Sequence, residues 1–271
     1  MRPPLFLSSA LLLLATLSAV AAFLQTPSST SSPVSPRHAL PLQRRGPTDT
    51  APVYDNNWNG RPQDQLLYTF FRAKLVQQLG GQDTASKDFA GLIQLIRKLN
   101  THFPAEGKAG TQLAAQNILL SLFPSWLPKA FAVMFSKPLP GFSARMNAYI
   151  TGLTTFWLMG ESEIIDVDID GGGIGQGQGL LVKRCRYLEE AGCASVCVNT
   201  CKIPTQNFFC QDMGLPLTMA PDYDDFSCKF SFGLTPPSIE EDEAMQIACF
   251  SQCPTAKAAS EMSPNCHQID V

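Results

Sequence analysis

Between residues 62 and 159, apolar side chains recur mostly at every third or fourth position, which is the period of one helix face. The pattern begins at Pro62, a favourable residue for a first helical turn, and ends at Gly80-Gly81. Every fourth position from Leu67 to Leu79 is apolar. We therefore predict a helix over this stretch, with its apolar face turned to a core.

Two further helices are predicted by the same periodicity. Asp83 or Thr84 is expected to cap the second helix, because a short polar side chain at that place can accept from the first backbone N–H groups. Its apolar face runs from Phe89 to Leu99. The third helix is predicted from Lys108 to Leu122.

Pro124 and Pro128 break the chain after the third helix. A short apolar helix around residues 131–135 and a fifth helix from Ser143 to Leu158 are predicted next. Large flexible or aromatic side chains are dense here, and they fit either ordinary core packing or a pocket for a large apolar ligand. They are Phe131, Met134, Phe135, Phe142, Met146, Tyr149, Phe156, Trp157 and Met159.

Residues 161–179 are acidic and then glycine-rich. The apolar residues Ile164, Val167 and Ile169 favour a short strand within a flexible hairpin or loop. The sequence from Asp166 resembles the start of a calcium loop, but its twelfth position is Gly177 instead of a glutamate. The glycines match neither of the two nucleotide-binding patterns, Gly-x-Gly-x-x-Gly and a loop that ends in Gly-Lys-Ser/Thr.

The remaining segment, from residue 180 to 256, contains most of the cysteines. Good helix formers over Leu181–Ala191 predict a helix that Gly192 interrupts. A strand is predicted at Ser227–Phe232. With the helical segment 62–159, this indicates an α+β, predominantly helical fold: a helical N-terminal half and a cysteine-rich C-terminal half with a few short strands.

All nine cysteines lie between Cys185 and Cys266. Cys193, Cys197 and Cys201 are four residues apart, and such neighbours on a helix lie too far apart for a disulfide with one another. They can instead meet a metal or an iron–sulfur cluster, or pair with distant cysteines. Disulfides, structural zinc and iron therefore stay open at this point, and histidine ligands are few: after residue 48 only His102 and His267 remain.

The N-terminus has the composition of a targeting segment. An apolar run from Leu5 to Leu17 precedes Val20-Ala21-Ala22, which fits a cleavage site, so residues 1–22 are predicted to be a signal peptide. Residues 23–48 are rich in Ser, Thr and Pro and carry basic residues but no acid, as transit peptides do. This order resembles the bipartite presequence of proteins imported into secondary plastids, and it predicts a plastid location.

The chain has 20 basic and 23 acidic residues. Residues 1–48 hold four of the basic residues, so their removal leaves a net charge of −7. This charge makes nucleic acid and anionic membrane surfaces unfavourable partners for the protein as a whole, although it permits a local basic patch.

One long motif extends from residue 180 to 209 and reads LLVKRCRYLEEAGCASVCVNTCKIPTQNFF. It resembles the C-terminal domain of the plastid β-carotene isomerases of strigolactone biosynthesis, the "dwarf" isomerases. Further matches are Tyr54-Asp55-Asn56-Asn57-Trp58, Asp212 to Leu217, Met219-x-Pro221, Tyr223 to Gly233 and Cys249-x-x-x-Cys253-Pro254. The resemblance covers residues 54–256, which we interpret as one domain followed by a tail at 257–271.

This resemblance implies an iron-containing enzyme that interconverts all-trans- and 9-cis-β-carotene in a plastid, with a carotenoid as substrate. Peripheral contact with plastid membranes is a further prediction. The iron would be non-haem iron or an iron–sulfur cluster. The candidate metal ligands are the cysteines of the family pattern: Cys185, Cys193, Cys197, Cys201, Cys228, Cys249 and Cys253. Cys210 and Cys266 fall outside the pattern. Pro204-Thr205-Gln206 is expected either to shape the site or to end a helix. The alternative function is a non-enzymatic iron–sulfur or zinc-binding plastid protein.

Overall fold

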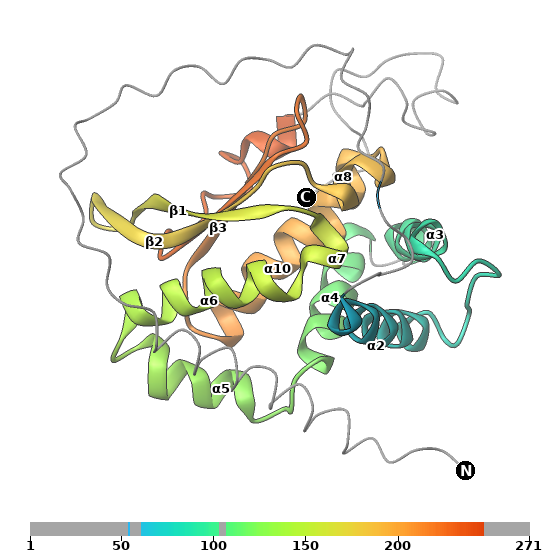
Figure 1. The fold of residues 1–271 in the computed structure, drawn as a ribbon, viewed down its shortest axis with the longest axis horizontal. Coiled ribbons are helices and arrows are strands. Elements are labelled where there is room, and N and C mark those ends of the chain that lie inside the picture. The colour runs from blue at the N-terminus through green and yellow to red at the C-terminus, as the bar shows by residue number, and fades with distance from the viewer. Residues whose placement is uncertain (1–53, 55–60, 103–106, 247–271) are drawn as a thin grey trace. The chain divides into compact units, whose positions relative to one another are not determined.

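The computed structural model describes residues 54, 61–102 and 107–246 (Figure 1). These residues belong to one compact unit. The predicted signal peptide at 1–22, the linker at 23–48 and the tail at 257–271 lie outside the described residues.

Three helices begin the described part: α2 (Pro62–Gln78), α3 (Phe89–Thr101) and α4 (Gly107–Ser121). They confirm the helices predicted from the periodicity. The predicted cap of the second helix is wrong, because Asp88 is the N-terminal cap: its carboxylate accepts from the Gly91 N–H at 2.9 Å. Asp83 and Thr84 instead lie in the connection and bind Arg72 of α2.

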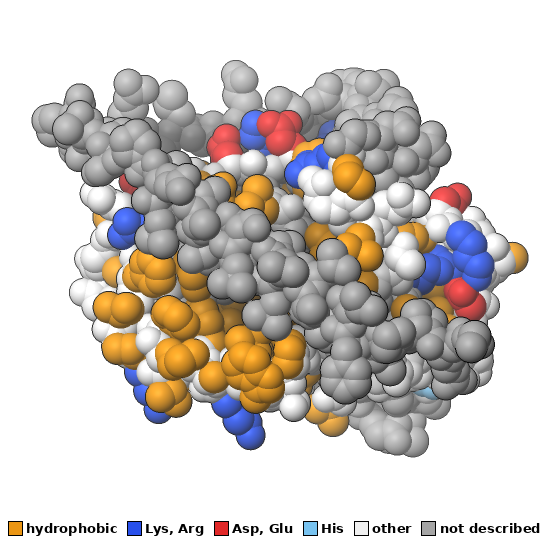
Figure 2. All heavy atoms as spheres, turned by 60° about the horizontal axis from the view of Figure 1, so that its bottom comes forward, with side chains coloured by type: hydrophobic (Ala, Val, Ile, Leu, Met, Phe, Trp, Pro, Cys, Tyr) orange, Lys and Arg blue, Asp and Glu red, His pale blue; other side chains and the backbone are white. Residues whose placement is uncertain are grey.

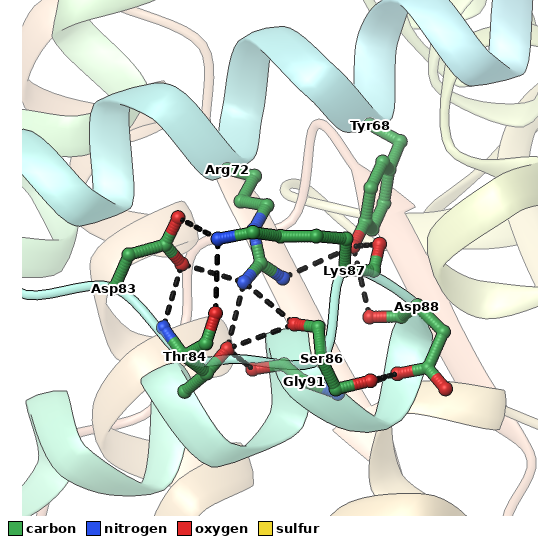
Figure 3. Close-up of polar contacts among 8 residues, drawn as sticks. All are labelled: Tyr68, Arg72, Asp83, Thr84, Ser86, Lys87, Asp88 and Gly91. Carbon is green, nitrogen blue, oxygen red and sulfur yellow. Dashed lines mark hydrogen bonds and ion pairs between the residues drawn. The ribbon is translucent and has the colours of Figure 1, made fainter.

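The α2–α3 junction is organised by the buried guanidinium of Arg72 (Figure 3). One of its terminal nitrogens donates to Asp83 at 2.6 Å, to the Thr84 hydroxyl at 2.7 Å and to the Ser86 carbonyl at 2.9 Å. The bend leaves no room for a side chain at Gly91, where a Cβ would lie 2.1 Å from the Ser86 carbonyl oxygen. The polar groups of the α2–α3 connection thus obtain hydrogen bonds from Arg72 of α2, the helix that directly precedes the connection.

The next helical segments are α5 (Leu127–Phe131), the π-helical turn η1 (Ala132–Ser136), α6 (Pro140–Thr154) and α7 (Phe156–Met159). The predicted fifth helix is thus present, but it starts earlier and breaks at Thr155. In α7, Trp157 packs edge-on against Tyr68 of α2, with ring centroids 5.8 Å apart.

A four-stranded antiparallel sheet has the order β1-β2-β4-β3 (Figure 1). The strands are β1 (Ser162–Ile169), β2 (Gly173–Val182), β3 (Leu217–Pro221) and β4 (Cys228–Phe232). The acidic, glycine-rich stretch is therefore a β-hairpin, which was one of its two predicted forms. Gly179 is required in β2, because a Cβ there would lie 2.3 Å from the Val167 side chain.

The chain then forms α8 (Arg186–Ala191), α9 (Ala194–Cys197), the π-helical turn η2 (Val198–Lys202), α10 (Ile203–Asn207), the π-helical turn η3 (Phe208–Asp212) and, after the sheet, the 3₁₀ turn η4 (Glu243–Gln246). The helix predicted from Leu181 starts later, because Leu181 and Val182 are paired in the sheet with Lys229 and Cys228.

Helix α6 lies along the sheet, and Gly152 permits this close approach: a Cβ there would lie 3.0 Å from the Leu180 side chain. The core is formed by fully buried side chains from both halves, among them Leu75, Phe89, Leu180, Leu217 and Phe232. The predicted α+β, mainly helical fold with a few strands in its C-terminal half is confirmed.

Candidate functional site

A continuous helical run from Ala194 to Asp212 carries the central cysteines. Two of its turns are π-helical: the N–H of Ile203 donates to the carbonyl of Val198, and that of Met213 to the carbonyl of Phe208. Such turns insert one extra residue and often mark functional sites. They also change the direction of the side chains that follow, so the cysteines do not form one regular stripe.

Three of the predicted ligands, Cys185, Cys193 and Cys197, lie at the ends of short helices. Gly192 ends α8 in the left-handed conformation, with a φ of 56°. Cys193 follows it as the N-terminal cap residue of α9. Cys185 is the N-terminal cap residue of α8, and Cys197 is the last residue of α9. None of the six described cysteines is in a disulfide.

Four of the cysteines form a neighbourhood that we call the thiol cluster: Cys185, Cys197, Cys201 and Cys228. Burial raises the pKa of Cys185 to about 11 and that of Cys197 to about 12. Burial also raises the pKa values of Cys201 and Cys228, and the neighbouring thiols raise them further. All four side chains are therefore neutral thiols near pH 7 when only protein groups surround them.

Hydroxyl groups lie beside these thiols. The hydroxyl of Tyr223 faces Cys197, and that of Thr205 faces Cys201, and each opposes the effect of burial on the thiol pKa. Tyr187 lies near Cys201 and shares a short hydrogen bond with the hydroxyl of Thr200. Burial raises the pKa of Tyr187, which therefore stays protonated beside the cluster.

A buried cation adjoins the thiol cluster. Lys202 follows Cys201 and forms an ion pair with Asp242, and their side chains are only 5% and 11% exposed. The positive charge of Lys202 partly offsets the raised pKa of Cys197 and Cys228. A hollow of about 210 Å³ opens at this ion pair, and Thr218, Met219 and Pro237 contribute to its wall. Ligand sites for drug-sized molecules are usually larger, so this hollow alone does not fit a long polyene.

A network of neutral polar side chains anchors the cysteine-bearing helix to α3 and α4. Asn199, which is fully buried, accepts from Gln112 of α4 at 2.9 Å and donates to the Ser195 hydroxyl at 3.1 Å. Asn100 of α3 also donates to Ser195, at 3.2 Å. Buried amides need such partners, so the network fixes the rotation of the helix against its neighbours.

The described residues do not by themselves form an iron site. Within 54, 61–102 and 107–246, no three His, Cys, Asp or Glu side chains are close enough together to hold one metal ion. Cys249 and Cys253 lie outside the described residues, so the complete set of seven predicted ligands stays a prediction.

The other candidate residues are placed as follows. Cys193 is buried, and Cys210, which lies outside the family pattern, is half-buried in η3. His102 ends α3. Pro204 does not end a helix, because the helical run continues to Asp212. It follows the π-helical turn directly and occupies the first turn of α10, where a missing N–H is tolerated.

The members of the dense aromatic and methionine set differ in burial, and Phe135, Phe142 and Tyr149 are half-buried. Phe131, Met146, Trp157 and Met159 are buried in the core, whereas Met134 and Phe156 are exposed. Sequence reasoning gave no role to Lys202, Asp242, Tyr223 and Asn199. The lysine and the asparagine between apolar residues of the helical motif, in Val198-Asn199 and Lys202-Ile203, were the available indication, because such side chains are seldom buried without partners.

The fold and the site define a class of α+β proteins in which buried thiols lie between a helical run and an antiparallel sheet. Residues 157–241, which contain the whole sheet and the thiol cluster, match the family described as beta-carotene isomerase D27-like, C-terminal. The C-terminal region of this chain is therefore similar to the β-carotene isomerase D27-like family, the family that its cysteine motif resembles.

Two curated relatives extend the similarity beyond this region. The chain is 29% identical over 192 residues to the chloroplastic beta-carotene isomerase D27 of Arabidopsis thaliana, which is 69% of each chain. It is 28% identical over 207 residues to the protein of the same name from Medicago truncatula, which covers 76% of this chain and 77% of the relative. No solved structure matches the chain.

Proposed function

We propose that this protein is a carotenoid isomerase that acts in a plastid. The observation that carries the proposal is the similarity to two chloroplastic β-carotene isomerases, which extends over more than two thirds of each chain. The family match covers the thiol cluster, so the similarity includes the part of the molecule with the most unusual chemistry. The plastid location rests on the names of these relatives and on the composition of residues 23–48.

The finer proposal is the interconversion of all-trans- and 9-cis-β-carotene. Rotation about a polyene double bond requires that its double-bond character is lost for a moment and then restored. The reaction consumes no water and leaves no net oxidation, so an environment that excludes water suits it. The neutral, buried thiols and the apolar sheet residues Phe230 and Phe232 are surroundings of this kind.

Iron remains part of the proposal as a prediction to be measured, and no step is derived through it. The test is the metal content of the purified protein, together with its visible absorption spectrum. About one iron or more per chain, lost in Cys197→Ser and kept in Cys210→Ser, would support the predicted ligands. Stoichiometric zinc in a colourless protein would contradict an iron centre.

The activity is tested by incubating the protein with all-trans-β-carotene in detergent micelles and separating the isomers by chromatography. We expect 9-cis-β-carotene to accumulate with the native protein. Cys197→Ala, within the thiol cluster, is expected to lose at least about tenfold in rate, whereas Cys210→Ala should keep its rate. A metal-replete protein that produces no isomer shift would remove the carotenoid assignment and favour the non-enzymatic metal-binding alternative.

A further inference from the structure

One segment of the described molecule differs from the rest in both exposure and charge. Residues 107–160 contain no Asp or Glu and carry Lys108, Lys129, Lys137 and Arg145, whereas residues 49–271 together have a net charge of −7. Of the eleven large apolar side chains that are exposed in the described residues, seven lie in this segment. An excess of exposed apolar side chains without any acid needs an explanation.

Four of these exposed side chains lie in η1 or directly before α5 and α6. Trp126, Val133, Met134 and Leu139 are 58%, 65%, 53% and 51% exposed. Trp126 and the pair Val133-Met134 are seven and eight residues apart, which is the spacing of one helix face. Figure 2 shows apolar side chains gathered on the side of the molecule to which α5 belongs, with basic side chains at the edge of the group.

The opposite side of the same helix is fixed to the core. Pro128, Phe131 and Ser136 are buried, and the Ser136 hydroxyl donates to the Met213 carbonyl at 2.7 Å. Gly214 lies so close that a Cβ there would be 3.2 Å from the Cβ of Ala132. This helical segment therefore has two apolar sides: one is packed in the protein, and the other faces solvent.

We propose that Trp126, Val133, Met134 and Leu139, with Lys129 and Lys137, form a docking face for the surface of an anionic lipid bilayer. Tryptophan at an apolar–polar boundary and lysines beside exposed apolar groups are the combination that interfacial helices use. The segment holds no acid that would repel an anionic surface locally, although the protein as a whole is acidic. No helix of the described part is long and apolar enough to cross a bilayer.

The docking face lies next to the end of the cysteine-bearing helix, because Ser136 and Ala132 contact Met213 and Gly214 directly after η3. From there an aromatic row leads inward: Phe123 stacks on Phe208, and Phe209 contacts Phe232 of the sheet. Under the proposed function, this arrangement would place the enzyme at the bilayer in which a carotenoid dissolves. The docking face itself rests on exposure and charge, independently of that function.

The test uses the full chain and vesicles without carotenoid, so that its result does not depend on isomerase activity. The vesicles contain phosphatidylcholine with or without phosphatidylglycerol, and their acyl chains carry bromine, which quenches tryptophan fluorescence on contact. The fluorescence of Trp126 is obtained as the difference between the native protein and Trp126→Phe. We expect this difference to be quenched by the anionic vesicles and much less by the neutral ones.

The double variant Lys129→Glu/Lys137→Glu is expected to need at least about tenfold more anionic lipid for half-maximal quenching. The matched control, Lys183→Glu/Lys229→Glu, changes the net charge equally on the sheet and should behave as the native protein. The apolar run Leu5–Leu17 is present in every variant, so it does not affect the comparison. Unquenched Trp126 fluorescence, or an equal loss in the control, would overturn the proposal. So would a dimer that forms without vesicles and is lost in Trp126→Phe.

Discussion

The α2–α3 junction and the cysteine-bearing helical run both depend on polar contacts, but they obtain them from different distances along the chain. Arg72 binds Asp83, Thr84 and Ser86, all within 14 residues of it. Asn199 binds Gln112, 87 residues away, and Lys202 binds Asp242, 40 residues away. The contacts of the junction join residues that are close in sequence and partly exposed to solvent. The helical run is instead held by buried partners from distant parts of the sequence.

This difference determines how much unfolding free energy is lost when a polar partner is removed from each region. At the junction, Asp83 is 35% exposed, so water can replace a lost partner. In the helical run, Lys202 and Asn199 have little or no access to water. A lost partner there leaves a buried polar group unsatisfied, which costs more than the contact itself contributes. The predictions below are ordered by the size of this effect.

The largest effect is expected for Lys202→Met, which leaves the Asp242 carboxylate buried without its cation. We expect a loss of about 3–5 kcal/mol in the free energy of unfolding, measured by urea denaturation. The double variant Lys202→Met/Asp242→Leu should recover most of this loss, because no unpaired charge remains. A loss below about 1 kcal/mol for the single variant would contradict the buried ion pair.

A smaller effect is expected for Asn199→Leu. The change removes the acceptor of Gln112 and one partner of Ser195, so the free energy of unfolding should fall by about 1–3 kcal/mol. Gln211→Leu, at an exposed position on the same helical run, serves as control and should change stability by less than about 0.5 kcal/mol. Equal effects of the two changes would show that the network does not anchor the helix.

The junction should respond less. Asp88→Ala removes the N-terminal cap of α3 and is expected to cost about 1 kcal/mol of unfolding free energy. Asp88→Asn can still accept from the Gly91 N–H and should retain most of the stability. A cost for Asp88→Ala as large as that of Lys202→Met would remove the contrast between the two regions.

The smallest expected effect is the dependence of stability on acidic pH through Asp83. The hydrogen bond from Lys87 lowers the pKa of Asp83 to about 2, helped by Arg72 and the Thr84 N–H. A carboxyl group whose pKa is lowered by folding stabilises the protein above its ordinary pKa near 3.8, and this contribution is lost as pH falls toward 2. The difference in unfolding free energy between the native protein and Asp83→Asn should therefore shrink from pH 5 to pH 2. A difference that is constant over this range would show that Asp83 does not titrate with folding.

The sequence predicted what depends on local pattern. The helix from Pro62, its end at the two glycines and the hairpin form of the acidic stretch follow from periodicity and turn residues. The cap of α3 was misplaced because Asp83, Thr84 and Asp88 are all suitable cap residues. Only the contact of Asp83 and Thr84 with Arg72 decides between them.

The site was predicted only in part, for a physical reason. The cysteine spacing identified the elements that carry the thiol cluster, but it could not show the two π-helical turns, because a spacing of four residues also fits a regular α-helix. One of the two roles predicted for Pro204-Thr205-Gln206, ending a helix, was wrong because helix propensity does not account for the π-helical turn before it. The buried pair Lys202–Asp242 joins residues 40 positions apart, and no local pattern specifies such a pair.

The proposal that this chain is a carotenoid isomerase is tested most directly by starting the reaction from both isomers. Purified protein is incubated separately with all-trans- and with 9-cis-β-carotene, and the isomer ratio is followed by chromatography until it is constant. A catalyst of isomerisation lowers the barrier without moving the equilibrium, so both reactions should reach the same ratio. Different final ratios, or no change beyond that in a protein-free control, would contradict the proposal.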